Sequence, residues 1–301
     1  MSSYAQDVKN ELAKIFDAER ESQLAEFVAL LAVGSKKISG RLEFSGSNAA
    51  VARKVITLAK KFFPTAKPEV AAIRRKNLYK DLSYIVRIFL TSELKNFLDT
   101  LDENELLKRT RYKVAYLRGA FLAKGTVNRP EGQYFLEMST LTVSASKFIC
   151  KQLEYLEFNA GFYQRRKYFV VWLREADAIC DFLGMVGAAN AVERFEIARN
   201  VKEVRLQANR SVNFETAAIN RAIEAAQRQL ADIKILIAKK VPVNEKLREA
   251  MILRLENPSS SVGELAEKIP MSRPGLSCRF KKIHQLAKKF RRKNKREVLK
   301  I

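Results

Sequence analysis

Two stretches of this sequence share one layout, and their repetition constrains the fold more than any other feature. The second, Tyr116–Gly125, reads Tyr-Leu-Arg-Gly-Ala-Phe-Leu-Ala-Lys-Gly, and the first, Glu26–Gly34, reads Glu-Phe-Val-Ala-Leu-Leu-Ala-Val-Gly. Small residues at helical spacing let a second backbone approach closely, and a terminal glycine commonly ends a helix. Matching the final glycines aligns Ala32 with Ala123. We therefore predict a duplication built on two motif helices.

Each motif helix is followed by the same alternation of strand and helix patterns. In both halves a two-strand pattern, an amphipathic helix, two more strands and a closing helix follow in order. Agreement over this many elements is stronger than one motif. The predicted fold class is α+β, with a duplicated αββαββα N-terminal domain followed by an all-α helix-turn-helix domain. We place the N-terminal domain at 1–200, with repeats at about 1–104 and 105–200.

Two further expectations concern apolar positions in this domain. Near the N-terminus, Val8, Leu12, Ile15 and Phe16 recur at helical spacing and predict one buried stripe. Trp172 follows two valines in a predicted strand and is expected in the core.

The sequence changes character after the second repeat. We predict a linker at 201–212 and a helical DNA-binding domain at 213–301. A long helix, Phe214–Lys239, is expected first. Its predicted buried stripe consists of Ala218, Ala222, Ala225, Gln229, Ile233 and Leu236. A helix-turn-helix is expected at about 260–293, because Ser261 and Glu264 form a capping-box pattern before one short helix, and another begins near Ser272.

The charge balance points to a polyanionic partner. The chain has 56 Lys and Arg against 33 Asp and Glu, a net charge of +23. A basic surface kept only for solubility is the plain alternative. From Lys239 to the end, however, 18 Lys and Arg face 6 Glu, so the excess is concentrated in about a fifth of the chain.

Other compositional features exclude several classes of site. Three cysteines without Cys-x-x-Cys spacing make disulfide frameworks and zinc ribbons improbable, and His284 is the only histidine. We therefore expect no metal site, no catalytic residue and no cofactor. Neither a membrane-length apolar run nor a secretory leader is present in the sequence, so we expect a cytoplasmic, nucleoid-associated protein that does not bind membranes.

The second helix of the predicted helix-turn-helix supplies the candidate contacts to double-stranded DNA. A major groove accepts one helix, whose N-terminal residues reach base edges. Arg273, Ser277 and Lys281 recur at four-residue intervals and are our candidates for base contact, while Ser272 caps the helix. If the segment makes about six phosphate contacts, the logarithm of the DNA-binding constant K should fall with the logarithm of the salt concentration at a slope of about −5. The candidates for phosphate contact are Arg279, Lys282, Lys288, Lys289, Arg291 and Arg292.

These charges have a simpler interpretation, in which they only solvate an amphipathic helix with Leu276, Phe280, Ile283, Ala287 and Phe290 on its inner face. Pattern alone does not separate the two interpretations, but the coincidence with the densest basic charge favours DNA binding.

The two motif helices with their following strands resemble the LAGLIDADG homing-endonuclease fold. With the C-terminal helices, the whole chain resembles the WhiA family of transcription regulators from Gram-positive bacteria. The resemblance rests on Tyr116–Phe121, Asn209–Ala217, Leu247–Ala250, Ser272–Gly275 and Arg279–Ile283. It implies a regulator of cell division and chromosome segregation, and of sporulation in spore-forming relatives. Phe214, Pro274, Ser277 and Cys278 depart from the family pattern, so the resemblance does not transfer a target sequence.

The resemblance also bears on catalysis. Nucleases of this fold carry an acidic residue just before each final glycine to hold catalytic metal ions. Here these positions are Val33 and Lys124, and neither side chain can ligate a cation. We therefore predict a DNA-binding regulator that is not an enzyme. The alternatives are an architectural nucleoid protein without sequence preference and, less favoured, a homing-type endonuclease with a relocated active site.

The N-terminal domain has basic turns at matching places in its two halves. Arg74, Arg75 and Lys76 lie in one turn, and Arg165, Arg166 and Lys167 lie in the other. They are either ordinary turn charges or a surface that contacts DNA or other transcription or division proteins. The sequence does not determine the oligomeric state.

Overall fold

The computed structural model describes residues 3–74 and 82–298, and the side chains of Arg74 and of residues 292–298 lie outside that description. The chain divides into two compact units, Met1–Glu203 and Val204–Ile301. Each has its own hydrophobic core and is described by itself.

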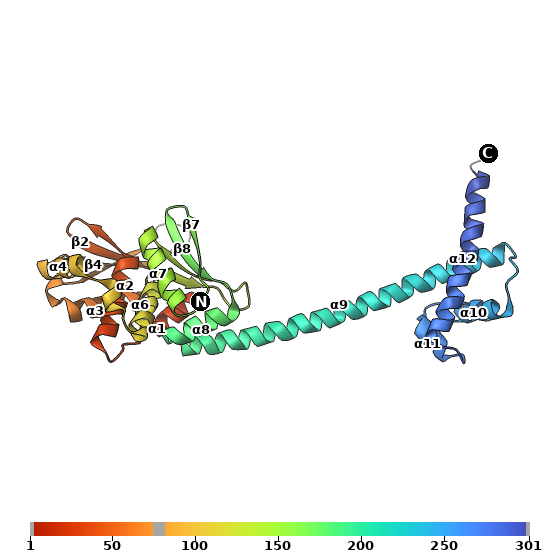
Figure 1. Ribbon diagram of the computed structural model, residues 1–301, viewed down its shortest axis with the longest axis horizontal. Coiled ribbons are helices and arrows are strands. Elements are labelled where there is room, and N and C mark those ends of the chain that lie inside the picture. The colour runs from red at the N-terminus through yellow and green to blue at the C-terminus, as the bar shows by residue number, and fades with distance from the viewer. Residues whose placement is uncertain (1–2, 75–81, 299–301) are drawn as a thin grey trace. The chain divides into compact units, whose positions relative to one another are not determined.

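The first unit contains two four-stranded antiparallel sheets with the same strand order, β1-β2-β4-β3 and β5-β6-β8-β7 (Figure 1). This identity of order confirms the predicted duplication. In the first sheet Phe44 pairs with Val86, and in the second Met138 pairs with Val171, so equivalent central strands place apolar side chains in the core. The strands are β1 Ser35–Ile38, β2 Arg41–Gly46, β3 Glu69–Arg74, β4 Leu82–Phe89, β5 Gly125–Val127, β6 Leu136–Thr140, β7 Gly161–Arg165 and β8 Tyr168–Leu173.

The two motif helices, α2 (Arg20–Gly34) and α6 (Thr110–Lys124), pack directly against each other at the centre of this unit. Gly119 permits the close approach, since a Cβ atom there would lie 2.4 Å from the backbone oxygen of Glu26. Both helices are followed at once by a strand, as predicted. The other helices of the unit are α1 Tyr4–Leu12, α3 Ala49–Phe62, the 3-10 helix η1 Pro64–Ala66, α4 Ser92–Thr100, α5 Glu103–Leu106, α7 Val143–Tyr155 and α8 Ala176–Val186.

Two apolar side chains of this unit lie where the sequence analysis did not expect them. Phe16 is 47% exposed, because α1 ends at Leu12 and the helical spacing therefore stops before it. Trp172 is only partly buried; its ring covers Gly161 on the neighbouring strand, and the Arg174 guanidinium lies 4.4 Å from the ring centroid. Alternation along β8 assigns Val171 and Leu173 to the core face and Trp172 to the other face.

The second unit is helical, and its core joins the end of α9 (Ala189–Ala238) to three further helices. Ile233 and Leu236 of α9 are buried, as predicted. The three helices are α10 Glu245–Glu256, α11 Val262–Glu267 and α12 Arg273–Val298. The α+β first unit and the all-α second unit give the fold class predicted from the sequence.

The helix α9 differs from its prediction in both start and burial. It was expected to begin at Phe214 after a linker at 201–212, but residues 189–238 form one helix. Residues 189–212 contain neither proline nor glycine and are rich in Ala, Glu, Lys and Arg, which favour helix. Ala218, expected in the buried stripe, is exposed, because core contacts begin further along the helix.

Candidate nucleic-acid interface

The helix-turn-helix is formed by α11 and α12, and side chains cap both helices at their starts. The Ser261 hydroxyl accepts from the Glu264 backbone N–H at 3.2 Å, and the Glu264 carboxylate accepts from the Ser261 N–H at 2.9 Å. This is the capping box that the sequence predicted. Ser272 Oγ accepts from the Gly275 N–H at 3.3 Å, so Ser272 caps α12. Residues 268–272 connect the two helices.

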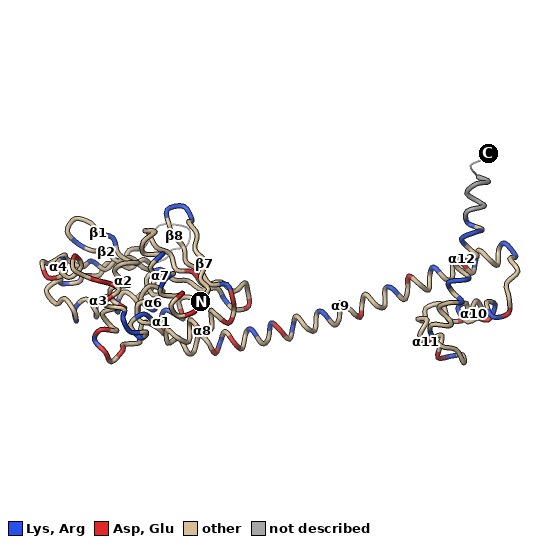
Figure 2. Tube along the Cα trace, viewed as in Figure 1, with Lys and Arg blue, Asp and Glu red and all other residues tan. Residues whose placement is uncertain are grey.

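One face of α12 is apolar and buried, and this orients the rest of the helix. Leu276, Phe280, Ile283 and Ala287 are buried and Phe290 is partly buried, which confirms the predicted inner face. Because these positions recur every three or four residues, the intervening positions point outward. Several Lys and Arg residues, drawn in blue in Figure 2, occupy these intervening positions along α12.

The three candidates for base contact differ in exposure. Arg273, the first residue of α12, and Lys281 are exposed, while Ser277 between them is partly buried. Their four-residue spacing keeps them near one another along the helix surface. Cys278 is an exposed free thiol beside them.

Of the six candidates for phosphate contact, three are exposed, two are in ion pairs with protein carboxylates, and one has a side chain that is not described. Lys282, Lys288 and Lys289 are exposed. The guanidinium of Arg279 instead donates to the Lys246 backbone oxygen at 2.9 Å and to the Glu249 carboxylate at 2.9 Å.

The remaining two phosphate candidates lie at the end of the described side chains. Arg291 forms an ion pair with the buried carboxylate of Asp232 at 3.0 Å, and the same carboxylate is 2.8 Å from Nδ1 of His284. The Arg292 side chain lies outside the described residues. Arg279 and Arg291 therefore tie α12 to neighbouring helices, which sequence periodicity did not indicate.

One buried arginine that was not predicted from the sequence packs against the inner face of α12. Arg254 on α10 is fully buried; it donates to Gln229 Oε1 at 2.9 Å and to the Asn257 backbone oxygen at 3.1 Å, and its guanidinium lies 5.4 Å from the Phe280 ring centroid. Burial lowers the pKa of Arg254, and Glu264 opposes that shift. Arg254 lies seven residues, or two helical turns, after the buried Leu247, and this spacing is the sequence signal that could have revealed its burial.

The ends of the two motif helices carry no carboxylate. Val33 is buried, and Lys124 Nζ donates to the Ser45 backbone oxygen at 2.7 Å. Within residues 3–74 and 82–298, no group of three or more His, Cys, Asp or Glu side chains is arranged to hold a metal ion.

The carboxylate of Glu26 is buried inside the first unit. Because α2 begins at Arg20, Glu26 lies within the helix, and its side chain points into the core. It lies 2.6 Å from Lys54 Nζ and 3.3 Å from Arg118 Nη2. Burial lowers the pKa of Lys54, while Glu26 counteracts part of this shift.

A second carboxylate extends this network. Asp17 lies 2.7 Å from Arg118 Nη2, and the Ser22 hydroxyl also donates to it. Burial acts to raise the pKa of Asp17, but Ser22 and Arg118 outweigh it and hold the pKa below its usual value. Both carboxylates are therefore neutralised by protein cations, an arrangement that suits core packing rather than metal binding.

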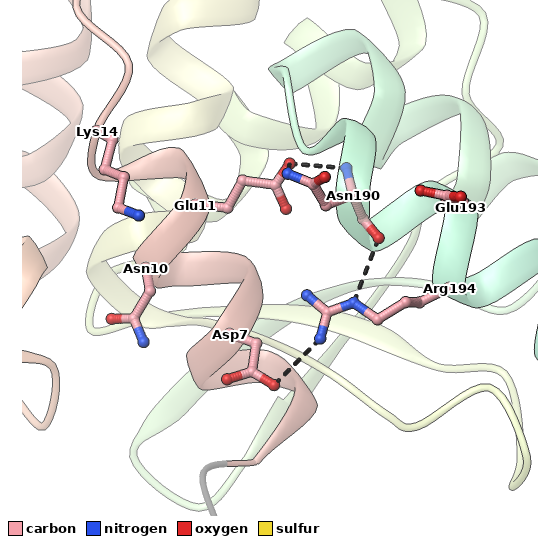
Figure 3. A pocket seen from close by; sticks show the side chains of 7 residues that line it. All are labelled: Asp7, Asn10, Glu11, Lys14, Asn190, Glu193 and Arg194. Atoms are coloured by element: carbon pink, nitrogen blue, oxygen red, sulfur yellow. Dashed lines mark hydrogen bonds and ion pairs between the residues drawn. The ribbon is translucent and has the colours of Figure 1, made fainter.

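A surface pocket of about 630 Å³ lies between α1 and the first turn of α9 (Figure 3). The Glu11 carboxylate accepts from the Asn190 backbone N–H at 2.8 Å and from the Ala191 N–H at 3.2 Å. Arg194 reaches Asp7 at 3.5 Å. These hydrogen bonds and this ion pair join α1 to the first turn of α9, so they fix the start of α9 within the first unit.

The two basic turns of the first unit are only partly described. Residues 75–81 and the Arg74 side chain lie outside the described residues. In the second turn, Arg165 forms an ion pair with Glu137 at 2.8 Å, and Arg166 and Lys167 are exposed. No helix within residues 3–74 and 82–298 combines the length and the hydropathy that a membrane span requires.

Comparison with known proteins gives matches to three family models that together cover most of the chain. Residues 20–102 match the WhiA N-terminal LAGLIDADG-like domain, 113–205 the WhiA LAGLIDADG-like domain and 208–287 the WhiA C-terminal HTH domain.

Whole-length relatives and solved structures agree with these models. A relative from Enterococcus faecalis, named "Probable cell division protein WhiA", is 36% identical over 97% of this chain and 99% of its own. One of the same name from Desulfitobacterium hafniense is 37% identical over 98% of each chain. The crystal structure of full-length DUF199/WhiA from Thermotoga maritima matches with a TM-score of 0.59 and 21% identity, over 96% of this chain and 99% of that one, which shows a shared fold.

Proposed function

This chain belongs to the WhiA family, and we propose that it is a non-catalytic DNA-binding regulator that acts in cell division. The names of the relatives support the part in cell division. Roles in chromosome segregation, in sporulation of spore-forming relatives and at the nucleoid belong to the same proposal. The observation that carries it is the row of exposed cations on α12, directed outward by a buried apolar face.

The proposed mode of binding places the start of α12 in the major groove. Arg273 offers two parallel donors, the geometry that matches O6 and N7 of guanine. Lys281, two turns later, is a more flexible donor, and the Ser277 hydroxyl can both donate and accept. Direct readout would thus begin at Arg273 and weaken along the helix.

Phosphate contacts would hold the helix in register on the duplex. Lys282, Lys288 and Lys289 are exposed and supply point charges along α12. Arg279 and Arg291 keep protein partners, so their contribution is to fix the helix and to add positive potential near it. Each phosphate that is neutralised should add about 0.9 to the steepness of the salt dependence.

The proposal excludes DNA cleavage by the first unit. Val33 and Lys124 stand at the two helix ends where nucleases of this fold hold metal ions, and the buried carboxylate of Glu26 already has two cationic partners. Supercoiled plasmid incubated with the full chain and Mg²⁺ or Mn²⁺ should remain intact. Efficient cleavage that is lost in Glu43→Gln or Glu137→Gln would reverse this conclusion.

Full-length protein and its Arg273→Glu variant test the assignment of α12. Charge reversal at the start of the helix should weaken binding to a target duplex by about 10- to 100-fold, because a base contact is lost and a phosphate-repelling charge is added. Lys234→Glu is the matched control: Lys234 is an exposed cation of the same unit on α9. Equal affinity of wild type and Arg273→Glu at physiological salt would contradict the assignment.

Footprinting separates this regulator from an architectural protein. Protection of a few defined sites supports readout of sequence, and uniform coverage supports a sequence-tolerant nucleoid protein. The net charge of +23 favours some sequence-independent affinity in either case, so the comparison needs competitor DNA in excess.

A further inference from the structure

A surface pocket of about 410 Å³ lies within the second unit, between α9 and the starts of α11 and α12. One wall comes from α9, where the lining positions recur at three- and four-residue spacing and so share one face of the helix. The lining residues are Ala218, Arg221, Ala222 and Ala225 on α9, with Ser261, Val262 and Arg273 on the other side. The pocket therefore places α9 beside the end of α12 that contains the first candidate for base contact.

The pocket opens where α9 stops packing against the helices of its unit. Ala226 and Ile233 of α9 are buried. Towards the N-terminus of the same helix, Ala225 and Ala222 are only partly buried and Ala218 is exposed. Because alanine side chains are short, this face of α9 does not fill the space in front of α11 and α12, and a groove remains.

The charged side chains of this lining are both arginines that lack an ion pair. Arg221 donates through Nε to the Ala217 backbone oxygen at 3.0 Å, one turn back along α9, which leaves its two Nη atoms for another partner. Arg279 and Arg291 pair with carboxylates of the same unit. Arg221 and Arg273 form no such pair with any residue in 3–74 and 82–298. Two cations from different helices thus line one groove without a protein anion.

The position of the groove indicates which anion it faces. In a helix-turn-helix the N-terminal end of the second helix points at the base edges, so a groove that opens beside this end faces the same duplex. Arg273 is the first residue of α12, and Arg221 lies on the other wall of the pocket. When Arg273 reaches into the major groove, Arg221 lies to its side, where the sugar-phosphate backbone runs.

On the basis of the proposed function, we propose that Arg221 of α9 is a further DNA contact, which binds a backbone phosphate beside the base that Arg273 reads. The Nη atoms of Arg221 donate to the phosphate oxygens, a charge-assisted pairing that guanidinium geometry favours. The adjoining deoxyribose packs against the short side chains of Ala218 and Ala222. The DNA interface then extends beyond α12 to α9, a helix to which the helix-turn-helix pattern assigns no DNA contact.

The full chain and its Arg221→Ala variant test this contact through the salt dependence of DNA binding. The probes are the duplex that footprinting shows to be protected and a duplex of mixed sequence, each followed by fluorescence anisotropy at several salt concentrations. Loss of a phosphate contact should weaken binding to both probes about tenfold and lower the steepness of log K against log salt by about 0.9. Arg273→Ala, which removes a base contact, should instead weaken the protected duplex more than the mixed one.

Arg205→Ala is the matched control. Arg205 is an exposed arginine of α9 in the same unit, it does not line the pocket, and it points to nearly the opposite side of the helix. Its removal takes away the same charge but should leave the salt slope close to that of wild type. Arg221→Lys retains a cationic donor and should largely restore the slope. Urea unfolding of Arg221→Ala should match wild type, since the side chain is exposed, which separates loss of contact from misfolding.

Equal salt slopes for wild type and Arg221→Ala would overturn this proposal, and the groove would then serve another anion. Equal losses in Arg221→Ala and Arg205→Ala would also overturn it, because the effect would be that of net charge alone. The two proposals fail separately. If Arg273→Glu weakens binding while Arg221→Ala does not, the assignment of α12 stands without the contact from α9. If Arg221→Ala lowers the slope while Arg273→Glu has no effect, α9 contacts DNA and the assignment of α12 is wrong.

Discussion

The two units of this chain use charged side chains in opposite ways. In the first unit Glu26, Lys54 and Arg118 are almost completely buried and satisfy one another. In the second unit most of the cations whose side chains are described on α12, at 273–291, are exposed, and within that range Arg279 and Arg291 are held by protein carboxylates. Similar residue types therefore serve packing in one unit and remain available to an external polyanion in the other.

A high net charge has different consequences at buried and at exposed positions. A total of +23 describes the whole chain, but part of that charge lies at buried positions or in ion pairs. Long-range attraction to DNA comes from the exposed excess, whereas a buried pair influences folding. Substitutions in the two units should accordingly change different measured quantities.

The largest expected effect is on the buried network of the first unit. Glu26→Ala removes the carboxylate between Lys54 and Arg118 and leaves two buried cations without their partner, so the free energy of unfolding should fall by about 3–5 kcal/mol. Urea unfolding followed by circular dichroism measures this. The control is Glu105→Ala, whose partner Lys108 is exposed on the same unit, and it should cost less than about 1 kcal/mol. Similar losses for both variants would refute the contrast between buried and exposed charge.

A second prediction concerns the contact between the two motif helices. Gly119→Ala adds a Cβ atom 2.4 Å from the Glu26 backbone oxygen, so α2 and α6 must separate, at a cost of about 1–3 kcal/mol. Gly263→Ala, on α11 of the second unit, is the control, because its nearest neighbour would be at 3.6 Å. Thermal unfolding should show a lower Tm for Gly119→Ala alone. An unchanged Tm would mean that the helices tolerate a wider spacing.

Much of this fold was predictable because its signals are local or repeated. The glycine-ended motif helices, the capping box at Ser261 and the inner face of α12 each depend on residues close in sequence. Duplication also doubled every strand and helix signal in the first unit. The order of the sheet strands confirmed it.

The features that were missed depend on contacts between distant residues. Arg118 meets Asp17 across 101 positions, and Arg279 meets Glu249 across 30, so no local pattern reveals either pair. The early start of α9 was missed for another reason: residues 201–212 are almost all exposed and add nothing to either core, although their helix propensity is high. The candidate DNA contacts could be placed on a helix from the sequence, but which cations stay exposed could not.

A third prediction separates the exposed from the engaged cations of α12. Lys282→Ala should lower the steepness of the salt dependence of DNA binding by about 0.9 and change the free energy of unfolding by less than about 0.5 kcal/mol. Arg279→Ala should instead reduce stability, since its bonds to Lys246 and Glu249 are lost. Filter binding at several salt concentrations and urea unfolding measure the two quantities. Identical profiles for the two variants would show that exposure does not distinguish their roles.

The smallest expected effect comes from Lys9 of α1, whose pKa is lowered by burial and by the neighbouring ammonium of Lys124. Its pKa is about 7 in the folded chain and 10.5 for an unperturbed lysine. Between these values the unfolded chain binds more protons than the folded chain, so this residue makes the free energy of unfolding rise with pH. Urea midpoints measured across that interval should therefore rise less steeply in Lys9→Gln than in wild type or in the control Lys151→Gln, which removes an exposed lysine of α7. If the slope were equal in all three, Lys9 would be an ordinary solvated lysine and would offer no contrast with the exposed cations of α12.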